Sequence, residues 1–184
     1  LAVALFQQLA PILEERYGAT AKWSYGRNEL RMPDGTLWLV RAATPSAGHG
    51  RSPSLILADE IWDISGDVID QGLLPAQRAQ PSPLCSMWST AGTEASHVML
   101  RFRSQGLALI DAGNPGPHYL AEWSVPDGVD PDDSRWWHLA NPALGHTISL
   151  DVLEAESQGP NRAAFLRAAL NQWVSTDRAW LEPG

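Results

Sequence analysis

The sequence has few of the features that mark secreted and membrane proteins. Its 184 residues include a single cysteine, Cys85, which rules out an internal disulfide framework and fits a reducing compartment. No apolar run approaches the roughly 18 residues of a bilayer span, and no signal peptide is visible, so no membrane association is expected. A disulfide scaffold and an integral membrane protein are therefore excluded.

Basic residues are also scarce. The chain has 13 Lys and Arg against 21 Asp and Glu, a formal net charge of −8, and its one lysine is Lys22. Phosphate binding needs concentrated positive charge, so a nucleic-acid surface spread over the whole chain is not expected, although a small local contact remains open. A phosphate-binding loop, G-x-x-x-x-G-K-[ST], is missing, because "GHGRSPS" at 48–54 lacks the lysine and its spacing.

The residues that are present indicate a folded chain. Hydrophobic residues make up 44% of the sequence and nine residues are Trp, enough for a sizeable core. Apolar spacing predicts a helix over 2–17, ended by Gly18, and then two strands around a Pro33-Asp34-Gly35 turn. The chain opens on Leu1 within a helical pattern, and we interpret it as a piece of a longer protein.

Two adjacent carboxylates follow a short apolar run, "LILADE" at 55–60. The run predicts a central parallel strand buried on both faces, and such strands deliver their C-terminal residues to a ligand crevice. There, Asp59 can hold Mg²⁺ through water, and Glu60 can orient or deprotonate a water that attacks a γ-phosphate. The alternative is a solvated pair at the positive N-terminus of the next helix.

A second candidate element lies further along the chain. A short strand is predicted over 84–88, with Cys85 as a small core residue, and "STAGT" at 89–93 follows it. Consecutive parallel strands end at the same edge of a sheet, so small hydroxylic residues there can sense the state of a nucleotide. The alternative is a simple turn, because Ser, Thr and Gly are turn residues.

The C-terminal half gives more mixed signals. The stretch 97–110 mixes helix and strand patterns, and as a strand it would place Arg101 and Arg103 on one face, more plausibly solvated than in contact with DNA or a neighbouring subunit's nucleotide. "HYLAEWSVP" at 118–126 alternates like a strand. Trp136 and Trp137 are expected as buried anchors. Two helices separated by Gly159-Pro160 are predicted from 149 onward; the second is expected to present one apolar side made by Phe165, Leu166, Ala169, Leu170 and Trp173.

These motifs together resemble the large terminase subunit of tailed bacteriophages. "LILADEIWD" is similar to its Walker B segment with the catalytic glutamate, and "STAGT" to its coupling motif. "YLAEWSVPDGVDPDDSRWWHLANPALG" and "FLRAALNQWV" resemble the passage into its second subdomain and the helix that ends it. The resemblance covers nearly the whole chain, and the last two segments are its more specific part.

The resemblance implies an α/β fold with a parallel sheet of the RecA-like, P-loop NTPase type, partial because the Walker A strand and loop are missing. Residues 1–125 would be the C-terminal portion of the ATPase domain. Residues 126–184 would form a small, mainly helical, lid-like subdomain leading to a nuclease domain that the chain lacks. Carried over by residue, Asp59 takes the magnesium and Glu60 is the catalytic base. The residues implied to sense the nucleotide and couple hydrolysis to motion are Ser89, Thr90, Gly92 and Thr93.

The implied cofactors are ATP and Mg²⁺, and the implied activity is an ATP-driven motor that packages viral DNA and, in the full protein, an endonuclease. Implied partners are double-stranded viral DNA, the portal of the procapsid, a small terminase subunit and further copies in a ring. The implied location is the host bacterial cytoplasm, transiently at the portal. We expect little ATP hydrolysis from the chain alone. The alternatives are another helicase-like translocase fragment and a non-catalytic interaction domain.

The charge balance generates a prediction about DNA. Residues 1–184 should bind double-stranded DNA weakly or not at all, because their net charge of −8 disfavours phosphate contacts. A gel-shift titration across salt concentrations measures this. Tight, salt-sensitive binding would contradict it.

Overall fold

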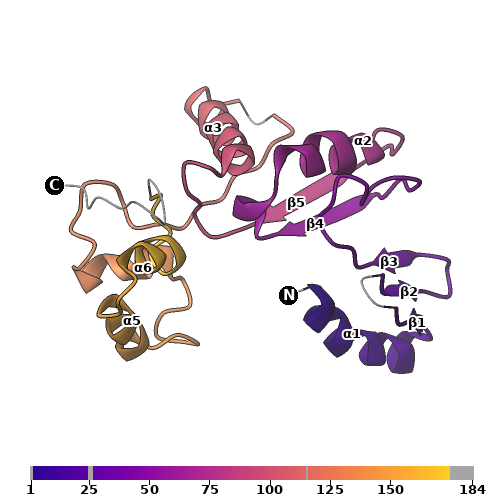
Figure 1. The fold of residues 1–184 in the computed structure, drawn as a ribbon, viewed down its shortest axis with the longest axis horizontal. Coiled ribbons are helices and arrows are strands. Elements are labelled where there is room, and N and C mark those ends of the chain that lie inside the picture. The colour runs from indigo at the N-terminus through magenta and orange to yellow at the C-terminus, as the bar shows by residue number, and fades with distance from the viewer. Residues whose placement is uncertain (1, 25–26, 115, 175–184) are drawn as a thin grey trace. The chain divides into compact units, whose positions relative to one another are not determined.

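The computed structural model describes residues 2–24, 27–114 and 116–174, which form an α/β chain of short strands and helices (Figure 1). The chain divides into two compact units. The first unit comprises Leu1–Asp59 and Asp67–Cys85, and the second comprises Glu60–Gly66 and Ser86–Gly184.

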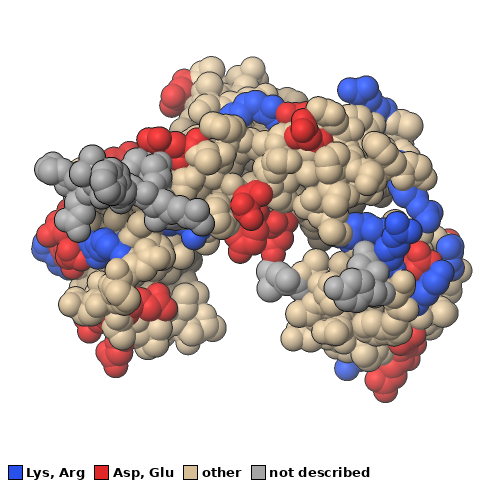
Figure 2. All heavy atoms as spheres, in the orientation of Figure 1, with Lys and Arg blue, Asp and Glu red and all other residues tan. Residues whose placement is uncertain are grey.

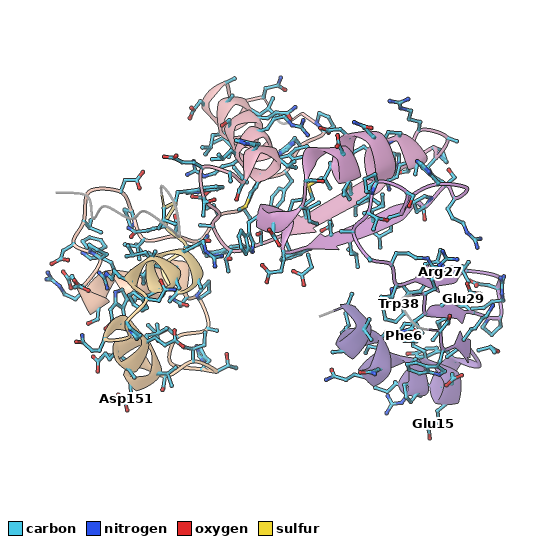
Figure 3. The ribbon with its side chains drawn as sticks, in the orientation of Figure 1. Phe6, Glu15, Arg27, Glu29, Trp38 and Asp151 are labelled. Carbon is cyan, nitrogen blue, oxygen red and sulfur yellow. The ribbon has the colours of Figure 1, made fainter. Side chains whose placement is uncertain are left out.

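The N-terminal part of the first unit is a helix packed on a small antiparallel sheet. The helix α1 spans Ala2–Tyr17, as predicted, and the strands are β1 (Thr20–Lys22), β2 (Glu29–Arg31) and β3 (Leu37–Leu39) in the order β1-β2-β3. Their shared core consists of Phe6, Ala10, Ala19, Leu30 and Val40. The Phe6 and Trp38 rings lie 5.1 Å apart between the helix and the sheet (Figure 3).

The turns around this sheet follow the predicted chemistry. Gly18 ends α1 at φ 67°, a left-handed conformation that glycine adopts without steric cost. The predicted hairpin is confirmed, with Leu30 paired to Trp38. At its tip, the Asp34 side chain accepts a hydrogen bond from the Thr36 backbone N–H at 2.8 Å. Local side-chain bonding of this kind is why Asp marks turns.

The strands β4 (Leu55–Asp59) and β5 (Leu84–Trp88) form a separate two-stranded sheet. The Leu84 N–H donates to the Ser54 carbonyl at 2.9 Å, so both strands begin at one edge and run parallel. The predicted bounds of β5 are confirmed. The prediction that β4 is buried on both faces is wrong for the described residues: Ile56 is 8% exposed, whereas Leu57 is 65% exposed. The side chains alternate because one face of β4 is covered within the chain.

A short helical segment connects these two strands. It is a π-helix over Val68–Leu73 that continues as α2, Leu74–Ala76. The Gln77 side chain at its end is buried, and its Nε2 donates to the carbonyls of Pro53, Ser54 and Leu84. One amide group therefore ties the beginnings of β4 and β5 together. Burial raises the pKa of the Cys85 thiol, as expected for a partly buried strand residue.

The second unit is mainly helical. After the 3₁₀ turn η1 (Ile61–Asp63) it contains α3 (His97–Asp111), a 3₁₀ turn η3 (Ser134–Trp136) and α4 (Trp137–Ala140). The helices α5 (Leu150–Ser157) and α6 (Arg162–Ala168) follow, as predicted, on either side of Gly159-Pro160. Its core consists of Val125, Trp137, Leu153, Phe165, Ala169 and Leu170.

Of the two tryptophans predicted as buried anchors, Trp137 is confirmed and Trp136 is not. Trp137 is 2% exposed, packs edge-on against Phe165 and donates from its indole N–H to the Pro131 carbonyl at 2.9 Å. Trp136 is 37% exposed. Adjacent residues at a helix start point in different directions, so only one of the pair enters the core.

The strand prediction at 118–126 is wrong, and the mixed pattern at 97–110 belongs to a helix. Residues 97–111 form the helix α3, and residues 118–126 contain no strand. The second stretch instead lies along α3: an added Cβ at Gly106 would lie 2.8 Å from the Leu120 Cβ, and Arg103 makes a two-pronged ion pair with Glu122, with Nε to Oε2 at 2.6 Å. The hydrogen bonds from Arg103 lower the pKa of the Glu122 carboxyl. Side-chain contacts thus replace the backbone ladder that the alternation suggested.

The acidic charge is unevenly divided between the units. The residue ranges of the first unit contain equal numbers of basic and acidic residues, so the net charge of −8 arises in the ranges of the second. On the face shown in Figure 2, basic side chains of the first unit gather around its three-stranded sheet. Within the described residues, no helix has the length and apolar character that a bilayer crossing requires.

A close backbone contact in the first unit generates a stability prediction. An added Cβ at Gly72 would lie 2.6 Å from the Pro45 carbonyl oxygen, inside normal contact distance. We expect Gly72→Ala to destabilise the chain by about 1–3 kcal/mol. The steric cost of the added methyl group should exceed the gain of about 1 kcal/mol that alanine brings through its higher helix propensity. Urea unfolding measures this. The exposed neighbour change Gln71→Ala is the control, and equal effects of the two would contradict the close packing.

Candidate active site

The chain turns sharply where β4 ends. Asp59 is the last residue of the strand, and Glu60 next to it adopts a left-handed conformation, φ 55° and ψ 46°, before the 3₁₀ turn η1 begins. This conformation costs a residue with a side chain of the order of 1–3 kcal/mol, and such strain often occurs at functional positions. Both carboxylates are exposed at the strand end. The sequence predicted these two residues as the centre of the site.

The Glu60 side chain is held by the residue two positions on. The Trp62 indole N–H donates to Glu60 Oε2 at 2.8 Å. The backbone N–H of Trp62 in turn donates to the Ser89 Oγ at 3.1 Å. Ser89 is the first residue after β5, so this bond connects the turn after β4 to the 89–93 loop. Glu60 and Ser89, singled out separately in the sequence, thus share Trp62 as a partner.

The remaining hydroxyl groups of the 89–93 loop also have defined contacts. The Thr90 Oγ1 accepts from Arg167 Nη1 at 3.4 Å. The Thr93 Oγ1 accepts from the Ala95 backbone N–H, and the Thr93 N–H donates to the Ser96 Oγ at 3.1 Å. The loop is therefore bonded on one side to α6 and on the other to the start of α3. A simple turn does not need these tertiary contacts.

Gly92 has no room for a side chain. An added Cβ would lie 2.2 Å from the Ser96 Oγ and 3.2 Å from a ring carbon of Trp173. Next to it, Thr93 forms a parallel bridge with Val174. The absence of a Cβ at Gly92 thus lets the 89–93 loop approach the segment that follows α6.

Asn171 makes the central contact between these segments. It follows α6 with φ 53°, and Glu60 and Asn171 are the two residues other than glycine with positive φ in the described ranges. Its Oδ1 accepts from the Ala91 backbone N–H, and its Nδ2 donates to the Trp123 carbonyl at 2.8 Å. One side chain thus satisfies backbone groups of the 89–93 loop and of the stretch before Val125.

Arg167, on α6, contacts both halves of the site. Its guanidinium carbon lies 4.2 Å from the centroid of the Trp62 ring, a close cation–π distance, and its Nη1 reaches Thr90. Sequence reasoning singled out neither Arg167 nor Trp62. Asn171 and Arg167 lay inside "FLRAALNQWV" and Trp62 inside "LILADEIWD", but none of the three was given a role. An Arg within a largely apolar helix gives no sign of a tertiary partner more than 70 residues away.

The donor set limits the way in which a metal can bind. Among residues 2–24, 27–114 and 116–174, no group of three or more His, Cys, Asp or Glu side chains is placed to hold an ion. Mg²⁺ commonly keeps several waters and takes one or two carboxylates together with substrate phosphates. The exposed carboxylate of Asp59 at the strand end fits that mode of binding.

The fold was compared with solved structures. The crystal structure of the HK97 bacteriophage large terminase matches with a TM-score of 0.72 at 23% identity, over 94% of this chain. The chain has the fold of part of a phage large terminase. The match covers 37% of that protein, so most of the HK97 terminase has no counterpart in this chain. No family model matches the chain, and no curated protein sequence does.

The comparison confirms the resemblance to phage terminases at the level of fold. It was predicted from four sequence segments, and the structural match extends well beyond them. At 23% identity the similarity concerns the arrangement of helices and strands. The roles of individual residues rest on the contacts described above.

The contacts of Asn171 generate a prediction. We expect Asn171→Gly to destabilise the second unit by about 1–3 kcal/mol, because glycine tolerates the left-handed backbone but leaves the Ala91 N–H without its acceptor. Faster hydrogen exchange at the Ala91 amide measures the loss. Asn114→Gly, at an exposed turn, controls for the entropy cost of glycine. An unchanged Ala91 exchange rate would show that Asn171 does not hold the loop.

Proposed function

We propose that the chain is part of the ATP-hydrolysing subunit of a viral DNA-packaging motor. The observation that carries the proposal is the bond between the two predicted motifs: Trp62, which holds Glu60, donates to Ser89 at the start of the 89–93 loop. Trp62 and Ser89 lie 27 residues apart in the sequence. Two motifs without a common function would not be expected to be joined through one residue in this way. The terminase-like fold gives independent support.

In the proposed mechanism, Glu60 positions a water for attack on the γ-phosphate of ATP. The water oxygen forms the new bond to phosphorus as the bond to the bridging oxygen of the leaving ADP breaks, and Glu60 accepts the proton. The hydrogen bond from Trp62 restrains the carboxylate that orients the water. General-base catalysis by a positioned carboxylate typically contributes about 10²–10⁴ in rate.

Asp59 is the proposed magnesium residue, acting through a bound water. The metal would supply charge neutralisation on the phosphates, and Asp59 would fix where it stands relative to Glu60. Adjacent residues at a strand end direct their side chains apart, so the two carboxylates can serve the metal and the water separately. This division suits the exposure of both side chains.

The parallel pair β4 and β5 is proposed as part of a larger RecA-like sheet. The exposed Leu57 on β4 supports this, because an apolar strand face is normally covered by further structure. Residues 1–125 would then belong to the ATPase domain, with the phosphate-binding loop supplied from outside this chain. Residues 126–184 would be the lid-like subdomain.

The remaining parts of the proposal concern the whole protein. Its substrates are ATP with Mg²⁺, and its partners are double-stranded viral DNA, the procapsid portal, a small terminase subunit and further copies in a ring. It would act in the host bacterial cytoplasm, transiently at the portal, and would carry an endonuclease in another domain. The competing interpretation is a non-catalytic interaction domain that presents the same two carboxylates.

The base assigned to Glu60 can be tested in the complete reading frame that contains this chain. Glu60→Gln should lower ATP turnover by about 10²–10⁴ while nucleotide binding is largely retained. Glutamine keeps an oxygen that can accept from Trp62, so the turn should stay folded. Steady-state phosphate release and nucleotide titration measure the two properties.

Asp63→Asn is the matched control, because Asp63 is an exposed carboxylate on the same turn. It should leave turnover within a factor of about two, since it accepts no proton in the mechanism. Full turnover by Glu60→Gln would place the base elsewhere, and no turnover by the unchanged protein would favour the interaction domain.

A further inference from the structure

The candidate site contains a cation that the proposed mechanism does not use. Arg167 belongs to α6, whereas Glu60 and Trp62 belong to the turn after β4, and all three lie in the second unit. The Arg167 Nε is buried, and the residue as a whole is partly buried. Placing a guanidinium here has a desolvation cost that an exposed arginine would avoid.

One contact of Arg167 leads through Trp62 toward the carboxylate proposed as the base. The guanidinium stacks 4.2 Å from the Trp62 ring centroid, and the Trp62 indole N–H donates to Glu60 at 2.8 Å. A partly buried cation over an indole face helps to hold the ring in place. The orientation of that ring sets the position of the N–H, and therefore of the Glu60 carboxylate.

A second contact from the same guanidinium reaches the 89–93 loop. Its Nη1 donates to the Thr90 Oγ1 at 3.4 Å. A planar guanidinium can stack with its face and donate with its edge at the same time, which a lysine ammonium cannot do. Arg167 therefore joins α6 to the residue that orients Glu60 and to the loop assigned to coupling.

We propose that Arg167 is a positioning residue, which sets the Glu60 carboxylate through Trp62 and makes its position depend on where α6 lies relative to the turn. The proposal rests on the function proposed above and adds a specific positioning contact to it.

The first test reads the indole directly in the 184-residue chain. In a ¹H–¹⁵N spectrum the Trp62 indole signal is identified by its loss in Trp62→Phe. Arg167→Lys should shift this signal, because the stacked cation is changed, and Glu60→Gln should shift it too. Arg162→Lys is the control: Arg162 is also on α6 and lies 5.3 Å from an aromatic ring, that of Phe165.

The second test measures kinetics in the complete reading frame. Arg167→Lys should lower kcat about tenfold with KM for ATP changed less than twofold, whereas Arg162→Lys should change neither. Because Arg167 acts through Trp62, adding Arg167→Lys to Trp62→Phe should lower kcat by less than a further twofold. Melting temperatures identify any variant that has simply unfolded.

The outcomes separate this proposal from the function on which it rests. An unmoved Trp62 signal in Arg167→Lys, a raised KM with kcat retained, or fully additive effects would overturn the positioning role while leaving the ATPase intact. Retained turnover in Glu60→Gln would overturn the proposed base itself. A shifted signal together with a fall in kcat alone supports both.

Discussion

The second unit depends on one side chain that bonds two separate backbone segments at once. Asn171 accepts from the Ala91 N–H and donates to the Trp123 carbonyl, and it does so from a left-handed backbone that few residues adopt. If it is released, the Ala91 N–H loses its acceptor in the segment after α6. The close approach of Gly92 to Trp173 and the bridge from Thr93 to Val174 then lose one of the contacts that align them. The arrangement of the candidate site is thus determined largely from the C-terminal side.

Glu60 and Asn171, the two residues other than glycine with positive φ in the part of the chain that the structure describes, have complementary roles in this arrangement. Glu60 bends the chain out of β4 so that Trp62 can bond both to it and to Ser89. Asn171 bends the chain out of α6 so that its amide faces the same loop. Strain of this kind persists only where surrounding contacts hold the backbone in place. Here these contacts are the hydrogen bonds of Trp62 and of the Asn171 side chain. Two local distortions, more than a hundred residues apart, therefore meet at the 89–93 loop.

Much of the fold followed from the sequence, and the failures have a common cause. Local chemistry predicted α1, the hairpin at Asp34, β5 and the two C-terminal helices, because each depends on spacing or turn residues within a few positions. The stretch 118–126 alternates like a strand, but Glu122 and Leu120 are fixed by α3, which lies elsewhere in the chain. Likewise, Glu60 and the 89–93 loop could be found as motifs. Arg167, Trp62 and Asn171 could not, because their roles exist only in the folded chain.

The buried Gln77 amide has an effect at the far end of the strands that it joins. By donating to carbonyls before β4 and within β5, it fixes how the parallel pair is aligned from the first residue. In a β-strand, a shift of the pairing by one residue moves every inward-facing side chain to the outer face and every outward-facing side chain to the inner face. An alternative alignment would turn Ala58 outward and redirect the acids that follow it. The direction in which Asp59 and Glu60 leave the sheet therefore depends on the neutral amide of Gln77, which bonds at the opposite end of the strands.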